Sequence, residues 1–154
     1  MKMLLLAVSK KPDARLQQLI DEYEARLKHY VTLQIKLVQP SDKHDALSIK
    51  FAEATRLLKE INADDYIILL DDKGKEFSSE ELALQIQKRL NDSLRRTVFC
   101  IGGAYGFHEV IYGRASMKLS LSRLTFPHQL CRLIFTEQLY RAFSILKGEK
   151  YHHG

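Results

Sequence analysis

One stretch near the C-terminus has the composition of a ligand-binding segment: Ser120-Leu121-Ser122-Arg123-Leu124-Thr125-Phe126-Pro127-His128. It is too apolar for a solvated loop, and polar residues interrupt it too often for a regular strand. Pro127 suits the start of the helix that follows, because a proline there sacrifices no helical hydrogen bond. Two interpretations are equally good. The stretch is either a buried connection between strand and helix or a cradle whose backbone groups hold an adenine.

A second candidate is the glycine-rich segment Gly102-Gly103-Ala104-Tyr105-Gly106, which ends an apolar run. Paired glycines allow backbone to approach a ligand closely and to expose its amide groups. The spacing is G-G-x-x-G rather than G-x-G-x-x-G, and no acidic residue lies about twenty positions on to bind a ribose. The simplest interpretation is a tight turn between a strand and a helix, and a nucleotide-dependent enzyme of the Rossmann type is disfavoured.

The positive charge of the chain is concentrated beside these segments. Residues 1–109 contain 17 basic and 17 acidic residues, whereas residues 110–154 contain seven basic and two acidic residues and so carry the whole net charge of +5. Such an excess favours an anionic partner, typically a phosphate backbone. A solvated helix face is the alternative, but the coincidence with the candidate binding segments favours RNA.

Length and composition predict one globular domain over residues 1–154. The chain is 45% hydrophobic and 28% charged, as is usual for such a domain. No apolar run reaches the roughly 18 residues of a membrane span, and the apolar start lacks the cleavage site of a signal peptide. The two cysteines, Cys100 and Cys131, lie in apolar contexts. We expect them to be buried thiols and not a disulfide, which suits a reducing cytoplasm. No Cys/His spacing matches zinc, so no metal is expected.

The hydrophobic pattern predicts strands that alternate with helices. Strands are expected at Met3–Val8, Val31–Val38, Tyr66–Leu70 (ended by Asp71-Asp72-Lys73-Gly74), Thr97–Ile101 and Met117–Leu119. Helices are expected at Leu16–Leu27, at Leu47–Leu58 with Ser41 or Asp42 as cap, from a Ser78/Glu81 capping box through Leu90, around His108–Tyr112, and from Pro127 to Leu146.

This alternation predicts an α/β fold, with an open, mostly parallel sheet covered by helices on both faces. Ligands of such sheets bind at the carboxyl ends of the strands. Leu70, Gly102-Gly103 and Leu119–Pro127 all fall at predicted strand ends. The three segments are therefore expected to converge on one site.

Taken jointly, several motifs resemble the SPOUT methyltransferases, and within them the RlmH type, over essentially the whole chain. The matching segments are Leu69-Leu70-Asp71, Ile101-Gly102-Gly103, Leu119–Ser122, Leu124-Thr125, Pro127-His128, Glu137–Phe143 and Tyr151-His152. The chain departs from some members at Ala104-Tyr105, where they carry Pro-Glu, and at His153-Gly154, where they carry Arg-Glu. Because of the second difference, the resemblance does not predict which residues of the tail contact the substrate.

The resemblance implies a C-terminal trefoil knot that binds S-adenosylmethionine in a bent shape. The cofactor contacts that it implies are Leu70, Gly103, Ser122, Arg123, Leu124, Thr125, Phe126 and Pro127. It also implies a homodimer in which each protomer completes the site of the other. The last helix agrees with such a partner, because it is apolar on more than one stripe, at Leu130, Leu133, Ile134, Tyr140 and Ile145.

The activity implied by the RlmH type is methylation at N3 of a pseudouridine in the helix-69 loop of 23S rRNA, on assembled ribosomes. That nitrogen carries a proton, so its attack needs a base or a stabilising cation. His152 is the first choice of base, because the ordinary pKa of histidine lies near neutrality. Arg141 and Arg132 suit phosphate or uracil oxygens, and Tyr151 can stack on the base.

Each of these roles has a competing explanation. A disordered tail accounts for His152 equally well, and a helix-surface charge is the somewhat better account of Arg141. The same fold acting on another RNA, such as tRNA, and a non-catalytic factor that binds RNA or the ribosome are the two other functions kept open.

Overall fold

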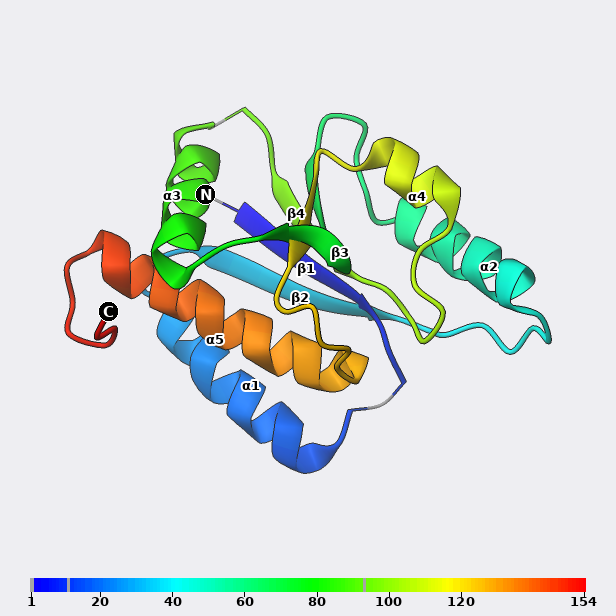
Figure 1. The fold of residues 1–154 in the computed structure, drawn as a ribbon, viewed down its shortest axis with the longest axis horizontal. Helices are drawn as coiled ribbons and strands as arrows, with labels where there is room; N and C mark the ends of the chain where they lie inside the picture. Colours follow the sequence, from blue (N-terminus) through cyan, green and yellow to red (C-terminus); the bar gives the residue numbers. More distant parts are fainter. Residues whose placement is uncertain (1, 11, 93) are drawn as a thin grey trace.

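The computed structural model describes residues 2–10, 12–92 and 94–154, and these form a single five-stranded sheet in the order β2-β1-β4-β3-β5 (Figure 1). All of its strand pairs are parallel. The strands are β1 (Lys2–Val8), β2 (Thr32–Val38), β3 (Tyr66–Glu76), β4 (Thr97–Ile101) and β5 (Met117–Ser120). The helices are α1 (Ala14–Leu27), α2 (Ala46–Leu58), α3 (Ser79–Asn91), α4 (Glu109–Arg114) and α5 (His128–Leu146). The predicted α/β class and parallel sheet are confirmed.

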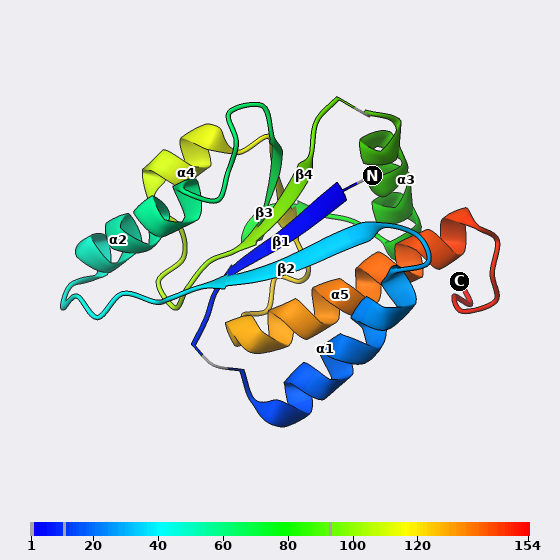
Figure 2. The ribbon, with the colours of Figure 1, turned by 180° about the vertical axis from the view of Figure 1, so that it is seen from behind.

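The two central strands, β1 and β4, are buried on both faces, which explains their unbroken apolar sequences. Successive side chains of a strand point to opposite faces, so Leu5 joins one core cluster and Leu6 the other. Helices α1, α3 and α5 cover the first face, and α2 and α4 cover the second (Figures 1 and 2). The prediction of helices on both faces is therefore confirmed.

Helix α3 begins as predicted. The Ser78 hydroxyl accepts a hydrogen bond from the Glu81 amide (3.1 Å), and the Glu81 carboxylate accepts one from the Ser78 amide (2.8 Å). The predicted cap of α2 is wrong, because neither Ser41 nor Asp42 caps it. Asp45 does so, by accepting from the Ser48 amide at 2.8 Å. The Ser41 amide instead donates to Glu53 Oε2 at 3.0 Å.

Strand β3 does not end at Leu70, so that prediction is wrong. It continues to Glu76, and its pairing with β5 is interrupted after Leu70 and resumes at Lys75. The intervening residues form the irregularity that the sequence suggested as a strand end. Gly74 is required there, because a Cβ atom would lie 2.7 Å from the Lys118 carbonyl carbon. The β3 irregularity sets the position of Asp71 and Asp72.

Cys100 and Cys131 are free thiols, as predicted, but only Cys100 is buried, and Cys131 is partly exposed, so the prediction of burial is wrong for Cys131. Burial raises the pKa of Cys100 to about 12. In the described ranges, no helix is long and apolar enough to cross a membrane. The same residues contain no group of three or more His, Cys, Asp or Glu side chains placed to hold a metal ion. The trefoil knot implied by the SPOUT resemblance stays a prediction.

A buried ion pair fixes the starts of β3 and β4 against each other. The Asp65 carboxylate accepts from Arg96 Nε (3.1 Å) and Nη2 (2.7 Å) and from the Asn62 amide (2.7 Å). Its side chain is only 1% exposed. Removing the partner of a buried charge is strongly destabilising, because the remaining charge is desolvated without compensation.

We therefore expect Arg96→Met to lower the free energy of unfolding by about 3–5 kcal/mol in urea titrations. The control is Arg15→Met, because Arg15 is 91% exposed and 3.5 Å from Asp13. Such a surface pair contributes less than about 1 kcal/mol. Equal effects of the two substitutions would contradict the structural role of the Asp65–Arg96 pair.

Candidate functional site

A pocket of about 550 Å³ lies where the irregularity of β3 meets the carboxyl ends of β4 and β5. Parallel strands bring their ends to one edge of the sheet, which is where ligands of such folds bind. The walls come from the three segments expected to converge. They are Leu70–Asp72, then Ile101–Ala104 with Gly106 and Phe107, and then Leu121, Ser122 and Leu124–His128. Cys131 of α5 and Tyr112 of α4 complete the lining. The convergence predicted from the sequence is thus present in the fold.

Seven of the eight predicted cofactor contacts line this pocket, which we call the first pocket. They are Leu70, Gly103, Ser122, Leu124, Thr125, Phe126 and Pro127. Arg123 does not line it, because its side chain is 86% exposed and lies 3.5 Å from Glu76. The Arg123 guanidinium is therefore on the outside of the pocket loop, where it can meet an anion from solvent.

The loop from Ser120 to Pro127 is held in shape by its own hydroxyl groups. The Ser120 hydroxyl lies 2.9 Å from the Ser122 carbonyl and 3.2 Å from the Asp72 carbonyl, so its proton can bond to either. The Ser122 hydroxyl accepts from the Leu124 amide at 3.0 Å. These bonds satisfy the polar groups locally and leave the apolar side chains of the loop to line the pocket. The loop is a partly exposed wall of the pocket and not a buried connection, and the prediction that its backbone groups hold an adenine stays a prediction.

Gly103 and Gly106 make the tight turn expected after β4. The Gly106 amide donates to the Gly103 carbonyl at 3.0 Å, and Gly106 has a φ of 80° that favours glycine. At Gly103 a Cβ atom would lie 2.6 Å from Oε1 of Glu53. The glycine therefore allows the buried Glu53 carboxylate to approach the turn. No local pattern predicts this contact, because Glu53 and Gly103 are far apart in the sequence.

Asp71 supplies a negative charge at the wall of the first pocket. Its carboxylate accepts hydrogen bonds from the Tyr112 hydroxyl (2.6 Å) and the Lys73 amide (3.0 Å). Partial burial raises the pKa of the Asp71 carboxyl, but these bonds outweigh burial, so the net pKa lies below its usual range. Burial and the bond to Asp71 raise the pKa of Tyr112. Tyr112 carries no signal in the sequence for this role, because only the fold brings it to Asp71.

The three predicted catalytic side chains, His152, Arg141 and Tyr151, lie together, and the tail is packed rather than extended. Arg141 Nη1 lies 3.0 Å from His152 Nδ1, and Arg141 Nη2 donates to Glu137 at 2.6 Å. The Tyr151 hydroxyl donates to the same Glu137 oxygen at 3.0 Å. Burial and hydrogen bonds with Tyr23 and Glu137 raise the pKa of Tyr151. Glu137 thus organises the cluster, and its i,i+4 spacing from Arg141 was the signal that could have identified it.

The tautomer of His152 follows from its two partners. Arginine has no acceptor, so Nδ1 must accept from Arg141, and the ring proton lies on Nε2. Nε2 then donates to Glu80 Oε1, 2.8 Å away. Both ring nitrogens are therefore engaged in the docked tail. Because Nε2 already carries a proton, His152 can accept one from a substrate only when the bond between Nδ1 and Arg141 opens.

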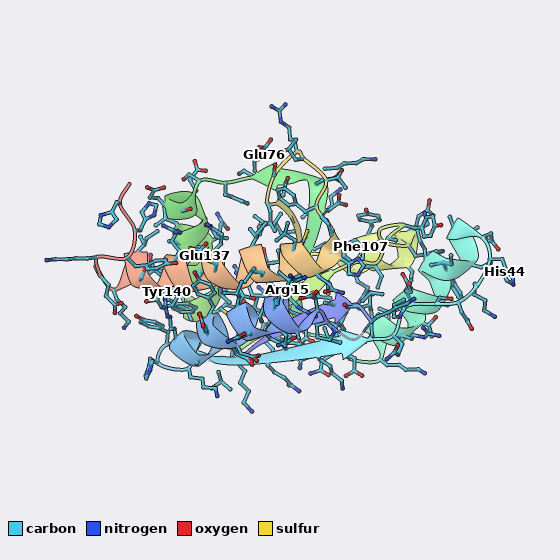
Figure 3. The ribbon with its side chains drawn as sticks, turned by 90° about the horizontal axis from the view of Figure 1, so that it is seen from below. Arg15, His44, Glu76, Phe107, Glu137 and Tyr140 are labelled. Atoms are coloured by element: carbon cyan, nitrogen blue, oxygen red, sulfur yellow. The ribbon has the colours of Figure 1, made fainter. Side chains whose placement is uncertain are left out.

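The tail cluster and the first pocket lie at opposite ends of α5 within one protomer. His128 and Cys131 of the helix line the pocket, whereas Arg141 is ten residues beyond Cys131, about 15 Å along the helix axis. Figure 3 shows the same separation, with Glu137 and Tyr140 near the end of the chain and the pocket residue Phe107 far from them. One protomer therefore does not bring the predicted cofactor contacts and the predicted catalytic residues together.

The prediction that Arg132 holds phosphate or uracil oxygens is wrong for this protomer. The residue is 1% exposed, so an RNA cannot reach its guanidinium from the surface. Burial lowers the pKa of Arg132, and no group among the described residues accepts a hydrogen bond from its guanidinium. Of the seven basic residues in the C-terminal segment, Arg132 therefore does not contribute to the positive charge at the surface.

Comparison with known proteins places the chain among methyltransferases. Residues 1–152 match the family model described as "Predicted SPOUT methyltransferase". Proteins named "Ribosomal RNA large subunit methyltransferase H" are 45% identical in Christiangramia forsetii, over 99% of both chains, and 43% identical in Cytophaga hutchinsonii, over 99% of this chain and 100% of the relative. A probable methylase family protein from Haemophilus influenzae shares the fold, with a TM-score of 0.53 at 13% identity over 99% of this chain and 70% of that one.

The Tyr112–Asp71 bond predicts a pH-dependent contribution to stability. Because the folded pKa of Asp71 is depressed, the contribution is present above the ordinary aspartate pKa and is lost as the pH falls through the folded pKa. We expect Tyr112→Phe to raise the pKa of Asp71 in a carboxyl NMR titration. We also expect it to cost about 1 kcal/mol of stability near pH 6 and much less near pH 3. Tyr105→Phe, at a residue 59% exposed, is the control. A Tyr112→Phe cost that is independent of pH would contradict the assignment.

Proposed function

Because the chain belongs to the SPOUT methyltransferase family, we propose that it uses S-adenosylmethionine to methylate N3 of a pseudouridine in the helix-69 loop of 23S rRNA. It acts as a single domain on assembled ribosomes in the cytoplasm. The names of the relatives specify large-subunit ribosomal RNA, and the RlmH resemblance supplies the nucleotide, the atom and the donor. The carrying observation is the pocket that gathers seven of the eight expected cofactor contacts.

The first pocket fits the proposed methyl donor. Its volume of about 550 Å³ is within the range of small-molecule sites. Leu70, Leu121 and Phe126 offer apolar walls for an adenine, and the turn at Gly103 offers backbone. S-adenosylmethionine supplies a methyl group that is already activated, so the task of the protein is to align acceptor and donor.

The positions of the basic side chains support contact with RNA. Lys10, Lys118 and Arg123 are exposed, and each lies near a pocket. Lys10 lines a cavity beside the Gly103 turn, Lys118 Nζ is 5.4 Å from the ring centroid of the pocket residue Tyr112, and Arg123 belongs to the pocket loop. Cations so placed can bind the phosphates on either side of a target nucleotide.

The separation of pocket and tail supports a homodimer with shared sites. In this arrangement the tail of one protomer, with His152, Arg141 and Tyr151, reaches the first pocket of its partner. An apolar surface is available for the contact. Leu124 of the pocket loop is 70% exposed, and Leu130, Leu133 and Ile134 on α5 are only partly buried. When RNA binds, Nδ1 of His152 exchanges Arg141 for the nucleobase and accepts its proton, while Nε2–H stays bound to Glu80.

The first test is methyl transfer from labelled S-adenosylmethionine to ribosomes from a strain that lacks the endogenous enzyme. We expect label on one 23S rRNA pseudouridine, identified by mass spectrometry of digested RNA. Bulk tRNA and a free helix-69 hairpin are the matched substrates. Both are expected to be poor, because the described residues form one small five-stranded unit, which leaves much of the recognition of the site to the ribosome. Label confined to tRNA would redirect the activity to another RNA. Efficient labelling of the hairpin would refute the need for the ribosome.

Mixing two inactive variants tests the shared site. Thr125→Arg fills the first pocket, and His152→Ala removes the proposed base, so each alone is expected to lose about 100-fold or more in turnover. After subunit exchange, half of the dimers carry one intact site, so about a quarter of wild-type activity is expected to return. Binding of S-adenosylhomocysteine to His152→Ala controls for folding. Absence of recovery with proven exchange, or a monomeric mass in solution at micromolar concentration, would reject the composite site.

A further inference from the structure

Next to the first pocket lies a second cavity that contains a buried carboxylate. This second pocket has a volume of about 370 Å³ and shares Gly103, Ala104 and His128 with the first. Glu53 of α2 faces it and is only 4% exposed. Glu53 Oε2 accepts from the Ser41 amide at 3.0 Å, whereas no described residue donates to Oε1.

The absent donor at Glu53 is costly, because a buried polar atom loses its hydration and gains no hydrogen bond in return. Packing does not force this cost on the fold. Gly103 leaves the space that Oε1 occupies, since any side chain at that position would begin 2.6 Å from it. Buried polar groups without partners are rare in folded proteins and require an explanation. A ligand that brings an N–H group to Oε1 supplies one.

The rest of the lining identifies the class of ligand. Lys10 offers an exposed cation for a phosphate, and Tyr105, 59% exposed, offers a ring face for stacking. A cation, an aromatic face and a hydrogen-bond acceptor together match a nucleotide with an N–H on its base edge. Figure 2 shows that the ends of β1 and β2 and the start of α5 lie on the same side of the molecule, so the cavity opens at the edge of the sheet that carries the first pocket.

We propose that the second pocket receives the target nucleobase and that Glu53 Oε1 accepts a hydrogen bond from N1–H of pseudouridine. This inference rests on the proposed function. Pseudouridine is joined to its ribose through carbon, so its ring carries N–H groups at both N1 and N3, whereas uridine has only N3–H. The two N–H groups flank one carbonyl and point in different directions. N3 can therefore face the methyl donor in the first pocket while N1–H faces Glu53.

Glu53 is then the residue that distinguishes pseudouridine from uridine. A site built to bind a ring N–H rejects the analogue that lacks it, because the carboxylate is left without a donor. Uridine held in the same pose, with its ribose and N3 in the same places, presents C5–H where pseudouridine presents N1–H, so Oε1 stays unpaired. The discrimination comes from one buried acceptor and needs no proton transfer to Glu53.

The experiment compares two ribosome preparations, one with pseudouridine and one with uridine at the target position, the latter from a strain without the pseudouridine synthase. For the wild type we expect kcat/KM to favour pseudouridine by about tenfold or more, and for Glu53→Ala the preference falls to within about twofold. Glu53→Gln is expected to keep part of the preference for pseudouridine, because the glutamine side chain has the same shape and still offers a neutral acceptor. Partial misfolding of a variant lowers its rates on both ribosome preparations by the same factor. The ratio of the two rates therefore reports the preference of the folded fraction alone. Glu22→Ala on the exposed surface of α1 is the control and keeps the full preference.

Two outcomes would overturn the assignment. One is an unchanged preference in Glu53→Ala. The other is a loss of S-adenosylhomocysteine affinity equal to the loss in kcat/KM, which would assign Glu53 to the cofactor. If the wild type methylates neither preparation, the proposed function fails, and binding tests the pocket by itself. Pseudouridine 5′-monophosphate is expected to shift the amide NMR signals of Ser41 and Tyr105 and to bind about fivefold or more tighter than its N1-methyl derivative. Equal binding of the two nucleotides would reject the second pocket as their site.

Discussion

The length and burial of α5 constrain everything else in this protein. The helix runs for 19 residues, about 28 Å, between α1 and α3 and against the sheet. Phe135, Leu139 and Phe143 are almost fully buried, and the Phe135 ring packs 4.6 Å from that of Phe99 in β4. A helix anchored in this way cannot bend to bring its ends together. Its start belongs to the first pocket and its end to the tail cluster, so a single chain holds the expected cofactor contacts and the expected catalytic residues apart.

The parallel sheet supplies the second constraint. Because every strand points the same way, the turns after β1, β2 and β4, the β3 irregularity and the loop after β5 all meet at one edge. Two adjacent cavities form there and share the Gly103 turn. Gly103 serves both, since it brings backbone to the first pocket and gives the Glu53 carboxylate room in the second. A methyl donor and an acceptor base require this kind of adjacency.

Much of this architecture could be predicted from local pattern. Apolar runs located the strands, the Ser78/Glu81 box located α3, and the rule for parallel sheets brought Leu70, Gly103 and the Ser122–Pro127 loop to one place. These features depend on residues close in sequence or on a general rule of topology. The predictions of a trefoil knot and of a dimer are of a different kind, because they rest on resemblance to a family and not on local pattern.

Most features that the sequence did not predict depend on contacts between distant residues. The continuation of β3 past Leu70 requires β5 as a partner. The cap of α2 is an exception, because the helix begins at Ala46, which places Asp45 and not Ser41 in the capping position. Arg132 is a basic residue in a basic segment, yet it is buried. Glu53 looks like an ordinary polar position of an amphipathic helix, and only its approach to Gly103 distinguishes it from the exposed glutamates.

The docked tail shows how these parts depend on one another. Glu137 binds both Arg141 and Tyr151, and Glu80 and Arg141 together engage both nitrogens of His152. A histidine so satisfied is oriented but cannot act as a base. Its activation therefore requires an incoming group that replaces one of its partners, and an RNA phosphate near Arg141 is a suitable one, because it can draw the guanidinium away from Nδ1. Coupling the release of His152 to the arrival of RNA would keep the base inactive until the substrate is in place.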